Sequence, residues 1–136
     1  MASIDAIEGI GPRHAEKLRA AGVRTCEALL ARGATRKGRK ELAESTGLGD
    51  TRILEWVNRA DLMRVKGVSS QYSDLLEAAG VDTVKELRRR NARNLTEAME
   101  AANRRRRNKL VQRTPSEKVV QKWIDGAKAL PPVVQH

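Results

Sequence analysis

The chain has 136 residues, a length that fits one domain or two small ones. Hydrophobic residues make up 40% and charged residues 32%, a composition that is not typical of a disordered protein. It contains no Phe and only three aromatic residues, Trp56, Trp123 and Tyr72. Ala, Leu and Val must therefore fill the core, which favours closely packed helices over a sheet. The single cysteine, Cys26, excludes an internal disulfide and a cysteine-based zinc site.

The net charge of +10 is concentrated in the second half of the chain. Residues 1–62 hold 11 basic and 9 acidic residues, whereas residues 63–136 hold 16 and 8. This surplus favours a polyanionic partner, and the alternative is a basic surface that only keeps the protein in solution. The N-terminus lacks the features of a signal peptide, and no run is long enough to cross a bilayer, so we expect a cytoplasmic protein without a membrane partner.

An internal repeat organises the sequence. Ile7–Ile10 recurs as Val65–Val68, and apolar residues and glycines keep this offset of 58 as far as Leu29 and its counterpart Leu87. Matches of this kind rarely arise by chance, so we expect two similar helical units.

Further along the chain the offset rises to 67, which pairs Trp56 with Trp123 and predicts that both lie in the core. The second copy has therefore gained nine residues, in an interval that contains Arg104–Arg107. The first offset pairs Cys26 with Val84, so we expect Cys26 to be a small buried residue and not a nucleophile.

Capping residues predict where helices begin and end. The predicted N-caps, in chain order, are Thr25, Asp50, Thr83 and Thr114. Pro115 would be the first residue of the last helix. Gly22 and Gly80 stand where a helix C-terminus favours a residue that tolerates positive φ. No segment alternates apolar and polar residues for long, so no strand is predicted.

The N-terminal segment resembles the helix-hairpin-helix motif, through the pattern Ile4-x-x-Ile7-x-Gly9-Ile10-Gly11-x-x-x-Ala15-x-x-Leu18. Two glycines let the chain reverse and bring its backbone close to a partner, which a Cβ would obstruct. Ile10 would pack back onto the two helices, and the small Ala15 lets them approach. The next helix is expected to start at Pro12, and its free N–H groups would form an anion site.

In this motif family the loop grips a nucleic-acid phosphate through backbone amides, often with a bound monovalent cation. The resemblance implies phosphate binding by Gly9–Gly11, with charge or donors added by Arg13, His14 and Lys17. It implies no cofactor other than a monovalent cation at the hairpin. The alternative is that the hairpin only packs, as it does in family members that bind proteins.

A second hairpin is predicted at Gly47-Leu48-Gly49, with Thr51 and Arg52 close to the same partner. Family members commonly pair two hairpins so that each addresses one strand across a minor groove. Asp50 departs from the pattern, because an acid beside the loop repels phosphate even while it caps its helix.

The second half departs further from the motif. Gly67-Val68-Ser69 has lost one glycine and Thr114-Pro115-Ser116 has none, so these two hairpins are expected to be structural. Arg104–Arg107, extended by Arg88–Arg90 and Arg93, would contact phosphates, and the alternative is a solvated turn. Four consecutive arginines cannot share one helix face, which predicts an exposed loop there. The first half would then dock by backbone amides while the second adds electrostatic attraction.

Neither a metal site nor a catalytic site is predicted. With only His14 and His136 in the chain, no histidine metal site or catalytic triad can be built, and no nucleophile–base pair or carboxylate cluster stands out. Asp61 beside Arg64 and Lys66 is expected to be a solvated pair at a helix end. An enzyme is therefore the least expected class.

The whole chain also resembles an uncharacterised, mainly bacterial domain-of-unknown-function family, itself a tandem helix-hairpin-helix relative. The segments that carry the resemblance are Ile7–Pro12, Trp56–Gly67, Leu75–Val84 and Trp123–Ile124. It implies an all-α fold of two tandem paired helix-hairpin-helix (SAM-like) units packed together. We expect the first unit at residues 1–62, a degenerate second unit with the basic insertion at 63–130, and a tail at 131–136.

These features predict non-enzymatic, largely sequence-independent binding of the phosphate backbone of double-stranded DNA. One alternative is a protein-interaction or assembly module, whose basic half would meet an acidic protein surface. The other is binding of structured RNA, because phosphate recognition alone does not distinguish the two kinds of duplex.

Overall fold

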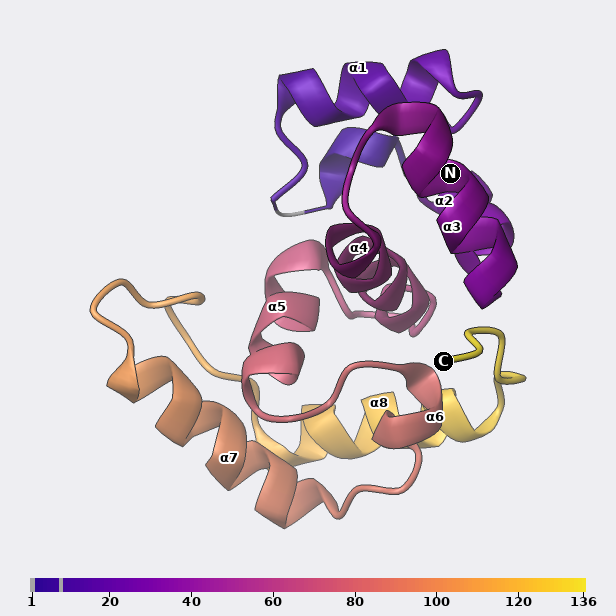
Figure 1. The fold of residues 1–136 in the computed structure, drawn as a ribbon. Helices are drawn as coiled ribbons and strands as arrows, with labels where there is room; N and C mark the ends of the chain where they lie inside the picture. Colours follow the sequence, from indigo (N-terminus) through magenta and orange to yellow (C-terminus); the bar gives the residue numbers. More distant parts are fainter. Residues whose placement is uncertain (1, 8) are drawn as a thin grey trace. The chain divides into compact units, whose positions relative to one another are not determined.

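A computed structural model describes every residue of the chain except Met1 and Glu8. The described residues form eight α-helices and one short 3-10 helix, and none of them lies in a β-strand (Figure 1). Ser3 and Thr25 make an isolated β-bridge. The all-α prediction is therefore confirmed.

The chain divides into two compact units. The first comprises Met1–Asp61 together with Val133–His136, and the second comprises Leu62–Pro132. The last four residues, which are part of the tail expected at 131–136, thus belong to the first unit, whereas Pro131 and Pro132 belong to the second.

The first unit starts with a short 3-10 helix before the first predicted hairpin. Its elements are η1 (Ile4–Ala6), α1 (Pro12–Ala20), α2 (Cys26–Gly33), α3 (Arg36–Thr46) and α4 (Asp50–Leu62). The start of α1 at Pro12 agrees with the prediction. Helix α2 packs against α3, and α1 packs against η1 and α3.

Local chemistry sets the ends of these helices. The hydroxyl of Thr25 accepts the N–H of Ala28 at 3.0 Å, as predicted for an N-cap. Gly22 has a φ of +89°, which is the conformation expected for a residue just past the end of α1. The predicted cap at Asp50 is wrong by one position, because α4 begins at Asp50 itself.

The core of the first unit is built from small and medium-sized side chains around one tryptophan. Ile4, Leu18 and Leu29 are fully buried, and Trp56 is nearly so. The N-terminal segment is held by backbone, since the N–H of Ile4 donates to the carbonyl of Arg24 at 3.0 Å. These contacts explain how so short an element as η1 stays in place.

Asp61 corrects one expectation from the sequence. Its place beside Arg64 and Lys66 predicts a solvated carboxylate, but only 1% of the residue is exposed. A buried carboxylate must have partners, and Asp61 does interact with other groups. The neighbours of Asp61 in the sequence do not predict this burial, because the burial of a side chain depends on its neighbours in the folded structure.

The segment Val133–His136 is attached to the first unit through its backbone. The N–H of Gln135 donates to the carbonyl of Ala34 at 2.7 Å. The carbonyl of His136 accepts a hydrogen bond from the Nε of Arg36. These bonds use main-chain groups, so no pattern of side chains in the sequence predicts them.

Arg39 joins this segment to the end of α2. Its guanidinium donates to the carbonyls of Gly33 at 2.8 Å, Ala34 at 3.3 Å and Gln135 at 2.7 Å. Arg39 is only 6% exposed, and its burial, reinforced by the nearby charge of Arg36, lowers the pKa of the guanidinium below its ordinary value. Such a buried cation is tolerated because carbonyl oxygens surround it.

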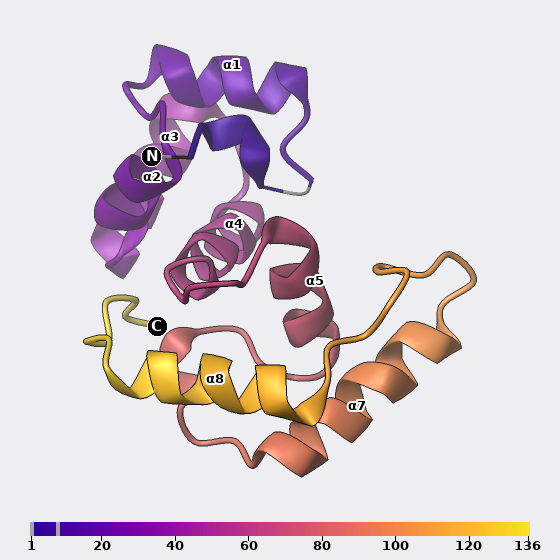
Figure 2. The same cartoon turned by 180° about the vertical axis from the view of Figure 1, so that it is seen from behind.

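The second unit contains four helices. They are α5 (Ser70–Ala78), α6 (Val84–Leu87), α7 (Ala92–Arg105) and α8 (Glu117–Lys128). Helix α7 packs against α5 and α8, and α6 packs against α8 (Figure 1, Figure 2). Leu76, Leu95, Met99 and Trp123 lie in its hydrophobic core.

The start of α8 differs from the prediction. The hydroxyl of Ser116 accepts the N–H of Val119 at 3.3 Å and is therefore the N-cap, so Thr114 and Pro115 precede the helix. Both Ser and Thr are favoured N-cap residues. The spacing of Thr114 to Glu117 predicted Thr114 as the cap, whereas Ser116 takes this role.

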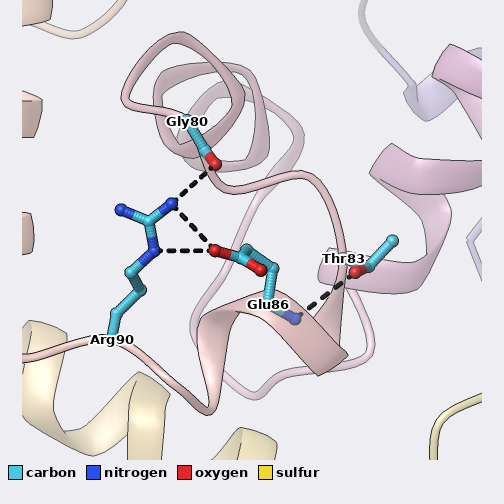
Figure 3. A network of polar contacts seen from close by, with 4 residues as sticks. All are labelled: Gly80, Thr83, Glu86 and Arg90. Atoms are coloured by element: carbon cyan, nitrogen blue, oxygen red, sulfur yellow. Dashed lines mark hydrogen bonds and ion pairs between the residues drawn. The ribbon is translucent and has the colours of Figure 1, made fainter.

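A polar network links α6 and the residues after it to Gly80, which follows α5 (Figure 3). Arg90 donates to Glu86 at 3.0 Å and to the carbonyl of Gly80 at 2.9 Å. The hydroxyl of Thr83 accepts the N–H of Glu86 at 3.4 Å. Arg90 therefore contributes to the structure of the second unit, and only part of the basic run at 88–90 serves as surface charge.

The first unit repeats part of this arrangement at the offset of 58, without the contact to a carboxylate, because Ala28 stands where Glu86 does. Arg32, the counterpart of Arg90, donates to the carbonyl of Ala21 at 3.2 Å, next to Gly22. Gly22 and Gly80 have φ values of +89° and +96°. The internal repeat read from the sequence is thus repeated in the contacts that end α1 and α5.

Replacing Arg39 by Ala should lower the free energy of unfolding by about 2–3 kcal/mol, because the carbonyls of Gly33, Ala34 and Gln135 lose a charged donor. Urea unfolding and hydrogen exchange of the α2 and α3 amides would measure this loss. Lys40→Ala removes an exposed charge beside it and should change stability by less than about 0.5 kcal/mol. Equal effects of the two substitutions would contradict the structural role of Arg39.

Candidate nucleic-acid interface

The turn at residues 9–11 leads into α1. Gly9 is exposed and has a φ of +89°, a conformation that side chains disfavour. Ile10 is buried, and its N–H donates to the carbonyl of Ile7 at 3.2 Å. Gly11 has an extended backbone, is partly exposed and is the N-cap of α1. Ile10 thus anchors the turn while both glycines stay at the surface.

Helix α1 differs at its N-terminus from six of the other α-helices, because Gly11 has no side chain to cap it. Side-chain oxygens cap six other helices, at Thr25, Thr35, Ser69, Thr83, Asn91 and Ser116. Within the part of the chain that the structure describes, the N–H groups of Gly11, Arg13 and His14 meet no acceptor. The first turn of α1 therefore offers donors that none of the described residues uses.

The space in front of these donors is open. A Cβ on Gly11 would meet no atom within 4 Å, and the same holds for Gly49. Neither residue has the positive φ that would require a glycine. The fold therefore does not explain why these two positions lack a side chain, whereas a ligand that approaches the backbone would explain it.

Two basic side chains lie on the exposed surface of α1, and a histidine lies beneath them. Arg13 and Lys17 are exposed, whereas His14 is partly buried. The imidazole ring of His14 packs on Trp56, with ring centroids 5.4 Å apart. His14 thus has a structural role in addition to any contact with a ligand.

His14 also connects the first turn of α1 with the first turn of α4. The Nη1 of Arg52 lies 3.1 Å from the Nε2 of His14, and since a guanidinium can only donate, Nε2 accepts this hydrogen bond. The structure therefore brings together His14 and Arg52, two candidates that lie 38 positions apart in the sequence. This side-chain contact links the first turns of the two helices.

The second predicted hairpin has mixed charge. Gly47 ends α3 with a φ of +75°, and Gly49, Thr51 and Arg52 are all exposed. Glu55 joins the last three in lining an open depression. The acidic residues, Asp50 among them, weaken this turn as an anion site compared with the turn at residues 9–11.

A second depression beside Asp50 and Thr51 is more basic. Arg36, Arg39 and Lys40 line it together with Leu54. These three cations on α3 were not singled out in the sequence, because their separation of three and four residues is ordinary for an exposed helix face.

Arg59 is a further residue that the sequence did not single out. Its Nη1 lies 3.3 Å from the position that a Cβ on Gly9 would take. The offset of 67 pairs Arg59 with Gly126, so a charged residue of the first unit stands where the second unit has none. This difference between the two copies was the only feature of the sequence that could have pointed to Arg59.

The charge of Arg59 affects whether a monovalent cation, which the motif family implies, can bind at the turn of residues 9–11. The guanidinium of Arg59 lies against Gly9, and the carbonyl of Ile7 is already used by Ile10. A positive neighbour disfavours a bound cation, although the carbonyl of Ile7 keeps a second lone pair. The function proposed below therefore uses no cation.

Arg104–Arg107 are all exposed, as the sequence predicted, but they do not form a single loop. Arg104 and Arg105 belong to the last turn of α7, and Arg106 is its C-cap. Cations at the C-terminus of a helix are stabilised by its dipole. Arg93, which the sequence placed in the same patch, forms an ion pair with Glu97 at 3.6 Å.

The described residues include no group of three or more His, Cys, Asp or Glu side chains that could hold a metal ion. Cys26 is buried, and desolvation raises the pKa of its thiol to about 11, so the thiol is neutral near pH 7 and is a poor nucleophile. In the same part of the chain, every helix is too short or too polar to span a lipid bilayer.

Comparison with protein families gives one result. The family described as a domain of unknown function (DUF4332) matches residues 8–130, so the chain belongs to this family. The family membership expected from the sequence is confirmed. Neither the curated proteins nor the solved structures include a match to the chain.

Two alanine substitutions should separate the roles of the two glycines in the first turn. Gly11→Ala should change the free energy of unfolding by less than about 0.5 kcal/mol, because its Cβ would enter open space. Gly9→Ala should cost about 1–3 kcal/mol, because alanine is strained at positive φ. Thermal unfolding of both variants measures the difference, and an equal loss would mean that Gly11 is also required by the fold.

Proposed function

We propose that this protein binds the phosphate backbone of double-stranded DNA without catalysis and largely without regard to sequence. The first unit would contact phosphates through the turn at residues 9–11 and the first turn of α1. The second unit would add electrostatic attraction through Arg104–Arg107. The resemblance of the first turn to a helix-hairpin-helix motif agrees with this proposal.

The observation that carries the proposal is the uncapped N-terminus of α1. The N–H groups of Gly11, Arg13 and His14 meet no acceptor among the described residues, and the space before Gly11 is open. Backbone donors at a helix N-terminus bind phosphate well, because the hydrogen bonds and the helix dipole act in the same direction. Arg13 and Lys17 lie on the same helix and add positive charge.

The surface also favours a charged partner over an apolar one. Val119, at 38% exposure, is the only large hydrophobic side chain that is exposed among the described residues. Interfaces between proteins depend on apolar anchors at their centre, whereas nucleic-acid binding depends mainly on phosphate contacts made by basic groups. A net charge of +10 supports the second kind of partner.

A salt titration tests the proposal. If six to eight phosphates are neutralised, the affinity for a labelled DNA duplex should fall roughly a thousandfold or more between about 50 and 200 mM salt. Fluorescence anisotropy at several salt concentrations gives the slope. An affinity that does not respond to salt would contradict phosphate binding. Competition with an RNA duplex of the same sequence shows whether DNA is preferred.

Substitution of Gly11 tests the contact itself. Gly11→Val should lower the affinity for the duplex roughly tenfold or more, because a side chain in the open space keeps the phosphate from the backbone donors. Gly126→Ala is the matched control, since it adds a Cβ to a helix of the second unit with ordinary contacts only. Circular dichroism should show unchanged helical content for both variants. Equal affinities would refute the role of this turn.

A further inference from the structure

A dense group of basic residues begins in the last turn of α7 and continues past the end of this helix. Residues 104–113, here called the basic loop, contain six basic and no acidic residues. The six are Arg104, Arg105, Arg106, Arg107, Lys109 and Arg113, and all of them are exposed. None forms an ion pair with an acid in the described part of the chain. Their mutual repulsion works against a compact conformation.

One buried side chain nevertheless holds the loop in a defined shape. The Oδ1 of Asn103 accepts the N–H of Leu110 at 2.9 Å and that of Val111 at 3.3 Å. Its Nδ2 donates to the carbonyl of Val111 at 3.0 Å. Asn103 is only 5% exposed, so its amide is almost entirely committed to closing the loop.

Apolar contacts strengthen this closure. Val111 is buried in the core of the second unit, and Leu110 packs against that core. Pro115 is buried shortly before α8 begins. The segment between Asn103 and Leu110, which holds five of the six cations, is therefore tied down at both ends. Figure 1 shows this segment leaving α7 and returning towards α8.

The closure brings two cations to one place. Arg104 and Lys109 line an open depression together with Asn103 and Glu100. They come from opposite ends of the segment that Asn103 closes. A flexible segment would spread these charges apart, whereas the closed loop keeps them at the rim of one depression.

We propose that the basic loop is a preorganised binding site for a nucleic-acid phosphate backbone, with Asn103 as its positioning residue. This inference rests on the proposed function and adds that the shape of the loop matters as well as its charge. A binding group that is already ordered loses less conformational entropy on binding than a flexible basic arm does. Asn103 itself touches no phosphate.

Substitution of Asn103 tests the proposal without changing the charge. Asn103→Ala should weaken binding of a labelled DNA duplex roughly tenfold, because the six cations lose their fixed positions. Limited trypsin cleavage within residues 104–113 should become faster. Asn108→Ala is the matched control, because Asn108 is an exposed residue of the same loop, and it should leave both measurements unchanged. If Asn103→Ala folds poorly, Asn103→Gln replaces it in the test. This variant keeps the amide but displaces it by one methylene, and we expect the same weaker binding and faster cleavage.

A charge variant completes the test. Replacing Arg106 and Arg107 by Gln should reduce the salt dependence of binding by nearly two log units, about 0.9 for each phosphate that is no longer neutralised. Asn103→Ala keeps every charge and should change the affinity much more than the salt dependence. An Asn103→Ala protein that trypsin cleaves faster but that binds the duplex with unchanged affinity would overturn the inference.

Different binding results would refute this inference and the proposed function. If the parent protein binds the duplex and Gly11→Val weakens binding, but Asn103→Ala does not, only the preorganised loop is refuted. If the parent protein does not bind the duplex at about 50 mM salt, where phosphate contacts are strong, both proposals are refuted.

Discussion

A tryptophan packed against a glycine turn is the contact on which each unit depends. In the first unit the Nε1 of Trp56 lies 3.7 Å from the position of a Cβ on Gly9, and in the second unit the Nε1 of Trp123 lies 3.1 Å from that of Gly67. Both glycines have positive φ, so a side chain at either position would be strained, and one at Gly67 would also crowd Trp123. The turn, the helix after it and the helix that carries the tryptophan are therefore held together at one point.

The two units share this contact but differ in what they leave open. The ring of His14 packs against Trp56 at a tilt in the first unit, as the ring of Tyr72 does against Trp123 in the second. Ser69 caps its helix with a hydroxyl, whereas its counterpart Gly11 leaves the donors of α1 unused. The second unit has gained the basic loop instead. On the proposed function, one scaffold presents backbone donors in the first unit and fixed cations in the second.

The sequence predicted well the features that recur at short range. The helical fold, the burial of Trp56 and Trp123, and the buried Cys26 all follow from the alignment of the two copies. It could not predict the burial of Asp61 or the attachment of Val133–His136, because these depend on backbone groups and neighbours distant in the chain. The candidate residues at the first turn were found through their glycine pattern. Arg59 left only a mismatch between the two copies as a signal, and Asn103 matches no motif and needed the structure.

The most direct test of DNA binding by this protein concerns the unused donors of α1. In amide NMR spectra of the isotope-labelled protein, addition of a short DNA duplex at low salt should shift the signals of Gly11, Arg13 and His14 more than any others in the first unit, because these N–H groups would then donate to phosphate oxygens. Gly11→Val should reduce those shifts, while the signals of the basic loop still respond. Unmoved signals at these three amides, with the duplex bound elsewhere on the protein, would contradict the proposed role of α1.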